Sequence, residues 1–158
     1  MTYLAHRRAH IKADVASITE PTYSTVGVGS TFSISSTPTK TSATVSGGYI
    51  VLHDQSSWRI EAQFLSDYYF TTQNATNMIK IQFWDGTSYH GEQGKYSQVE
   101  NLNMCRNACK LFIPSSAITT SISLIPRVVS MSGTIGDTTT ATNAIALPEL
   151  RIIEIPND

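Results

Sequence analysis

The chain has 158 residues, a formal net charge of −1 and a charged fraction of 15%, well below the quarter that is typical of soluble domains. No basic stripe is available to neutralise phosphates, which argues against a nucleic-acid partner. No apolar run reaches the length of a membrane span, and charged residues interrupt the first twenty positions, so neither a membrane helix nor a secretion signal is expected. The sequence predicts one domain over residues 10–158, behind an N-terminal arm of residues 1–9.

Small hydroxyl side chains dominate the composition, with 20 Thr and 19 Ser. Thr suits a pleated, half-buried surface, Ser clusters suit loops, and no long segment repeats with the helical period. The expected fold class is therefore all-β, a compact jelly-roll sandwich of about 8–10 antiparallel strands.

Alternation of apolar and polar residues predicts most of the strands, and turn residues separate them. The last strand is apolar on both faces, which predicts a central position in the sheet. In chain order, the expected strands are 10–18, 26–34, 49–53, 58–64, 78–84, 88–98, 111–113, 118–132 and 149–155.

Three segments and one proline do not follow this pattern. The polar stretches 35–48 and 133–146 predict long loops, and 99–110 is the one stretch that could hold a helical turn. Pro126 lacks a backbone N–H, which predicts that its strand lies at an edge or bends there.

The stretch MIKIQFWDGTSYHGEQGKY, residues 78–96, is glycine-rich and ends near a lysine. A phosphate-binding loop would need glycine at position 89 and a small hydroxyl residue at 96, and both positions hold tyrosine. Asp85-Gly86 is instead a turn dipeptide between two alternating segments, so the stretch predicts a β-hairpin.

Candidate chemical groups are few, and we expect no enzyme activity, no metal and no cofactor. His90 beside a glutamate could act as an acid–base group, but no nucleophile motif accompanies it. His6 and His10 could share a metal only if their segment were helical. Cys105 and Cys109 are expected to be reduced thiols.

Tyr68, Tyr69 and Phe70 form a run of three aromatics at a strand end. Such a run cannot point one way, so at least one ring is expected outward, where it could recognise a sugar or a protein groove. The bland alternative, which exposure statistics favour, is that the run forms an apolar lid over the end of the sandwich.

Four phrases carry a family resemblance: SGGYIV, WRIEAQF, IQFWDGTSYHGEQG and the segment RNACKLFI, followed by a closing hydrophobic strand. Over roughly residues 10–155 this order resembles the trimeric jelly rolls of the complement-globular-head and tumour-necrosis-factor type, and most of all their bacteriophage virion branch. The calcium-binding loop of some members has no counterpart here, because carboxylates do not cluster at ligand spacing.

The resemblance implies a homotrimer, with the first and last strands nearest the threefold axis. The trimer-interface positions that follow from this are Ile11, Ala13, Val15, Leu150, Ile152, Ile153 and Ile155.

The function that this implies is structural: a trimeric capsid decoration or cement protein of a virion, assembled in the host cytoplasm, whose partner is the major capsid protein. The basic arm is expected to contact the shell, through Tyr3, His6, Arg7, Arg8 and His10. The alternative is a receptor- or glycan-binding head of a phage fibre or tail.

Overall fold

The structure of the chain is a computed structural model that describes residues 12–19, 26–39, 42–53, 58–68, 70–71, 76–97, 105–113, 121–135 and 148–156. These residues form an all-β fold, as the composition predicts. The ten strands are β1 (Lys12–Thr19), β2 (Ser33–Ile34), β3 (Ala43–Ser46), β4 (Tyr49–Leu52), β5 (Trp58–Tyr68), β6 (Met78–Trp84), β7 (Tyr89–Ser97), β8 (Cys105–Ile113), β9 (Ile122–Ser132) and β10 (Glu149–Pro156).

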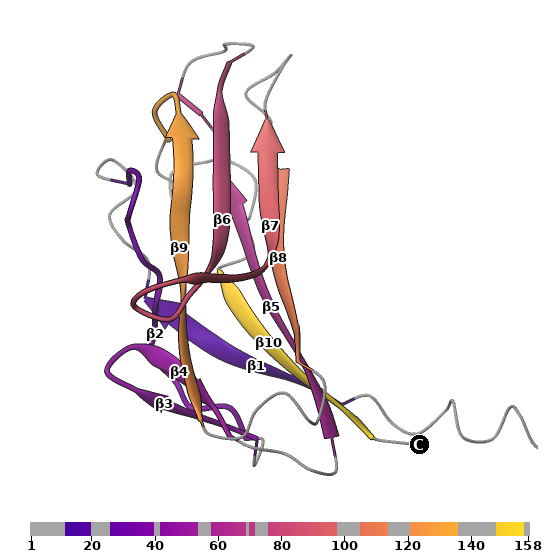
Figure 1. Cartoon of the computed structure of the whole chain (residues 1–158). Coiled ribbons are helices and arrows are strands. Elements are labelled where there is room, and N and C mark those ends of the chain that lie inside the picture. Colours follow the sequence, from indigo (N-terminus) through magenta and orange to yellow (C-terminus); the bar gives the residue numbers. More distant parts are fainter. Residues whose placement is uncertain are drawn as a thin grey trace, which may run out of the picture.

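The strands pair antiparallel in the order β2-β1-β10-β5-β8-β7-β6-β9-β4-β3. This order folds into two layers, and Figure 1 shows β6 and β9 crossing in front of β1, β10 and β5. The layer of β1, β10, β5 and β8 continues into the layer of β7, β6, β9 and β4 where Glu92 of β7 pairs with Lys110 of β8. The last strand, β10, lies inside the sheet between β1 and β5, as its apolar sequence predicts.

The opposite seam of the jelly roll is bridged by the segment that leads into β2. The backbone N–H of Ile34 donates to the carbonyl of Gly48 at 2.9 Å, and that of Phe32 donates to the carbonyl of Pro126 at 3.0 Å. These bonds link β2 and the residue before it to the β3–β4 turn and to β9, so the sheet is nearly closed.

The core lies between the two layers and is made of inward-facing side chains from almost every strand. Phe32 and Phe64 meet at its centre, with ring centroids 5.0 Å apart. Burying each such ring contributes roughly 1.5–3 kcal/mol. The alternation predicted for β5 and β6 is confirmed, because Ile60, Ala62, Phe64, Ile79, Ile81 and Phe83 are all buried.

Two predicted connections contain strands. The polar stretch 35–48 holds β3, which pairs with β4 along all four of its residues. The predicted helical turn over 99–110 is wrong for its described part, because β8 begins at Cys105 and pairs with β5 along its whole length. Long-range pairing with β5 overrides the weak local preference of this segment.

Two expectations about single residues also fail. Val28 does not share a face with Val26, because a turn closed by Ser30 N–H and the Gly27 carbonyl turns it outward. Pro126 lies inside the sheet, between β6 and the segment before β2. The N and O of one strand residue point to the same side, so the missing N–H faces the irregular Phe32 segment and costs no bond to β6.

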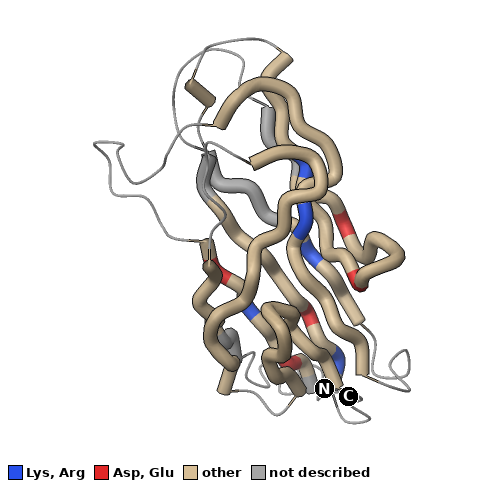
Figure 2. Tube along the Cα trace, turned by 90° about the vertical axis from the view of Figure 1, so that its left-hand side faces the viewer, with Lys and Arg blue, Asp and Glu red and all other residues tan. Residues whose placement is uncertain are grey.

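Charged residues are sparse on the fold, and long stretches of the trace in Figure 2 carry none. One of the few, Glu154 at the end of β10, accepts hydrogen bonds from the hydroxyl and backbone N–H of Ser42, at 2.5 and 3.2 Å. These two hydrogen bonds connect β10 in one layer to the residue before β3 in the other.

Candidate functional site

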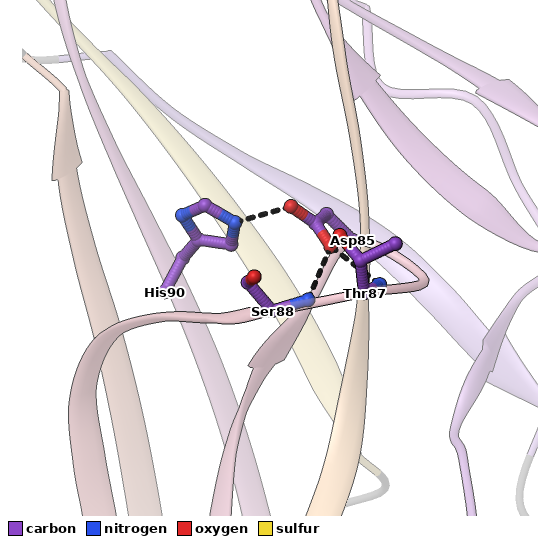
Figure 3. A network of polar contacts seen from close by, with 4 residues as sticks. All are labelled: Asp85, Thr87, Ser88 and His90. Atoms are coloured by element: carbon purple, nitrogen blue, oxygen red, sulfur yellow. Dashed lines mark hydrogen bonds and ion pairs between the residues drawn. The ribbon is translucent and has the colours of Figure 1, made fainter.

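The tip of the β6–β7 hairpin holds the densest polar network among the described residues (Figure 3). One carboxylate oxygen of Asp85, Oδ1, accepts hydrogen bonds from the backbone N–H groups of Thr87 and Ser88, both at 2.7 Å, and from the Thr87 hydroxyl at 2.8 Å. The other oxygen, Oδ2, lies 2.6 Å from Nε2 of His90, which donates to it. Gly86 supplies the positive φ of 103° that the turn needs.

This network stabilises the ionised form of Asp85. The hydrogen bond from His90, followed by those from Ser88 and Thr87, lowers the pKa of Asp85 far below its usual value. Both oxygens are already engaged by the hairpin itself, so the carboxylate has little capacity left for a substrate. The predicted hairpin is therefore confirmed, and Asp85 acts as its cap.

A second histidine, His53, lies at the end of β4. Its Nε2 is 2.8 Å from the Thr44 hydroxyl and its Nδ1 is 3.0 Å from the Ser121 hydroxyl. A serine nucleophile needs a histidine that is oriented by a carboxylate, and here a threonine hydroxyl takes the position of that carboxylate. The arrangement joins β3, β4 and β9 by hydrogen bonds and lacks the orienting group of a hydrolase.

Metal and thiol chemistry find little support in the described part of the chain. Within it, no group of three or more His, Cys, Asp or Glu side chains lies close enough to hold a metal ion. Cys109 faces the core and is fully buried, and burial raises the pKa of its thiol to about 12. The side chain of Cys105 and the residues His6 and His10 lie outside the description.

The outer face of the layer β1-β10-β5-β8 carries two of the exposed large apolar residues in the described part of the chain. The register places Ala13, Ile153, Glu61 and Phe112 in one row across its four strands. Phe112 exposes 53% of its surface, and so does Val15, one step along β1. The two residues lie at opposite ends of the face, and Arg151, Gln63 and Glu61 occupy outward positions between them.

A groove lies at the β8 end of this face. It is open, about 600 Å³ in volume, and its lining is Glu61, Gly91, Glu92, Lys110, Leu111 and Phe112. The groove therefore combines an exposed aromatic ring with two carboxylates and one ammonium group.

A bulge in β7 shapes the groove. Residues 91–93 stand opposite Gln82 alone, because Ile81 pairs with Gly94 and Phe83 with His90. The Gln82 amide fills the bulge: its Nε2 donates to the Gly91 carbonyl at 2.6 Å, and its Oε1 accepts from Gln93 at 3.2 Å. Bulges commonly re-aim side chains next to functional sites, and this one brings Glu92 opposite Lys110.

The structure divides the predicted interface positions into two groups. Leu150 and Ile152 are fully buried in the core of their own chain, so they cannot contribute to a surface. Val15 is exposed and Ile153 and Ile155 are half-buried on the outer side. Ile11 and the side chain of Ala13 lie outside the described part.

Among the other predicted contact residues, the structure describes the side chain of Phe70 alone. Phe70 is fully buried and bridges to Ile135, so it belongs to the core and cannot present a ring to a ligand. Tyr69 and the side chain of Tyr68 are outside the described residues, and so is the whole arm, with Tyr3, His6, Arg7, Arg8 and His10.

Phe112 and Glu92 are not among the site residues that the sequence predicts. The signal for Phe112 was present, because Cys109, Leu111 and Ile113 alternate and leave Phe112 on the opposite face. Glu92 reaches the groove through the bulge, for which the sequence offers only the glycines at 91 and 94.

Comparison with models of known protein families finds no match, and comparison with curated proteins finds no significantly similar sequence. Among the described residues, no helix is long and apolar enough to cross a membrane.

Proposed function

We propose that this protein is a non-enzymatic structural protein of a virus particle, a homotrimer that decorates and stabilises the capsid. The observation that carries the trimer is the pair of exposed apolar residues, Val15 and Phe112, at opposite ends of one sheet face. A ring of identical copies needs two different patches on each copy, so that one patch meets the other on the next copy.

The two patches complement each other in chemistry. Both are apolar: the β1–β10 end offers Val15 and Ile153, and the β8 end offers the Phe112 groove. Covering the half-exposed Phe112 ring contributes roughly 1–2 kcal/mol before the costs of association are subtracted. The sparse surface charge favours such apolar contact, because few charges must lose their water.

The virion role rests on the family resemblance of the sequence, and the jelly-roll strand order supports it, since viral capsid proteins use this architecture repeatedly. The proposed partner is the major capsid protein, contacted through the basic arm of residues 1–9. An arm that orders on docking adds contact area without a large rigid patch.

The test of the trimer is the solution mass, measured by light scattering on a sizing column. We expect about three times the chain mass of 17.3 kDa. Phe112→Asp and Val15→Asp should each give monomers that remain folded. Val28→Asp is the matched control, because Val28 is also apolar and is even more exposed but lies on the other layer. A monomeric wild type, or a trimer that survives both substitutions, would refute the proposed assembly.

A further inference from the structure

The outer face of the second layer carries a row of three large side chains that the trimer does not use. Trp84 of β6 pairs with Tyr89 of β7, and Arg127 of β9 pairs with Gln82, one outward step from Trp84. All three point outward, because the intervening residues of β6 and β9 face the core. We name Arg127, Trp84, Tyr89 and the neighbouring Val28-Gly29 turn the Arg127 platform.

Two contacts and a close-fitting turn hold the guanidinium of Arg127 in place. Its central carbon lies 4.5 Å from the centre of the Trp84 ring, within cation–π range. Its Nε donates to the Gly29 carbonyl at 3.3 Å. Gly29 has a φ of +88°, and a Cβ there would lie 3.3 Å from Nη2 of Arg127. The turn therefore fits closely around the arginine and limits its rotation.

The charge of Arg127 has no acidic partner in the described part of the chain. The outward positions of β6 and β9 carry Lys80 and polar or apolar residues, and none is Asp or Glu. Asp85, just beyond β6, is held by the hairpin through both of its oxygens. A fixed guanidinium with free N–H groups matches a carboxylate bidentately.

Apolar surface borders the charge on two sides. Val28 is 68% exposed and Tyr89 is 37% exposed. The Tyr89 ring packs on Trp84 at a centroid distance of 4.6 Å. Trp, Tyr and Arg are the residue types that dominate binding energy in protein interfaces. Because Arg127 and Tyr89 both pack on the indole, Trp84 positions the guanidinium and is poorly placed to stack on a sugar ring.

We propose that the Arg127 platform binds an acidic segment of a partner protein, with the guanidinium holding a carboxylate and with Val28 and Tyr89 covering apolar atoms beside it. The platform lies on the layer opposite Val15 and Phe112. This inference is therefore independent of the trimer and can fail or succeed separately.

The test uses the full chain and a short oligoglutamate peptide at low salt. We expect binding that shifts the NMR signals of the Arg127 Nε–H and the Trp84 indole N–H. Arg127→Gln should weaken binding about tenfold or more, since a charge-assisted bidentate pair is lost. Arg127→Lys should also weaken it, because lysine lacks the fork. Arg59→Gln, which removes a charge on β5 of the other layer, should change the affinity less than about twofold.

Val28→Asp is a second variant that tests the platform in a folded chain. Val28 is exposed, so the substitution leaves the core untouched. It places a carboxylate beside the Gly29 turn and should abolish peptide binding at an unchanged melting temperature. The proposal is overturned if oligoglutamate binds Arg127→Gln and Arg59→Gln equally, or if Val28→Asp binds normally. Preference for inorganic phosphate or a heparin fragment over oligoglutamate would also overturn it.

Discussion

Gly91 is the point where the two layers come closest at the β7–β8 seam, and we predict that Gly91→Ala is strongly destabilising. A Cβ at this position would lie 2.2 Å from the Lys110 carbonyl oxygen and 2.9 Å from the Cα of Leu111, where ordinary contact begins at 3.4 Å. Both obstacles are backbone atoms, so β7 must move away from β8 by about 1 Å.

The magnitude follows from what that movement breaks. Alanine at the observed φ of +76° costs roughly 1–2 kcal/mol by itself. The shift also disturbs the Glu92–Lys110 pair and the bond from Gln82 to the Gly91 carbonyl. We expect a total loss of about 3–4 kcal/mol, a large share of the 5–15 kcal/mol that holds a typical domain folded.

Gly86 provides a matched control in the same hairpin. Its φ is +103°, but a Cβ there meets nothing within 4 Å, so Gly86→Ala should cost only the conformational term of about 1–2 kcal/mol. Urea denaturation followed by circular dichroism measures both variants. Equal losses for the two would show that the close approach of Gly91 to β8 contributes nothing, and the reasoning would be wrong.

Three further predictions concern other parts of the chain. The pKa of Asp85 is lowered in the folded state, so its contribution to stability is complete above the unfolded pKa near 4 and is lost as the pH falls below that value. Asp85→Asn should therefore flatten the dependence of the free energy of unfolding on pH between about pH 5 and pH 2. Identical pH dependences for the variant and the wild type would contradict this. In a Cys105→Ser background, the Cys109 thiol, buried and with a pKa of about 12, should resist a thiol reagent near pH 8 until urea is added, whereas rapid labelling of the folded protein would count against its burial. Deletion of residues 1–9 should leave a folded trimer that no longer binds shells of the major capsid protein, and unchanged binding would rule out the arm as the contact.

The sequence predicts those strands and turns whose structure depends on a few neighbouring residues. In β5 and β6 every second residue is large and apolar, so alternation alone locates the inward side chains. Asp85-Gly86 predicts its turn because the aspartate caps the backbone and the glycine adopts positive φ, both within four residues. Such features are local, and local chemistry is visible in a sequence.

Elements that depend on distant partners are not predictable in this way. β3 has only Ala43 and Val45 on its inner face, too little apolar surface to distinguish it from a loop until β4 pairs with it. The Arg127 platform joins β9, β6, β7 and the Gly29 turn. No spacing in the sequence brings these four segments together, so the platform appears only when the register of three strands is known.

The position of β10 also has a kinetic consequence. Its neighbours are β1 and β5, which end at Thr19 and Tyr68, whereas β10 begins at Glu149. During synthesis both neighbours leave the ribosome long before their shared partner exists, and each exposes an unpaired edge in the meantime. Folds that depend on such late, distant pairings fold in milliseconds to seconds. Chaperone binding to nascent chains should therefore persist until β10 emerges.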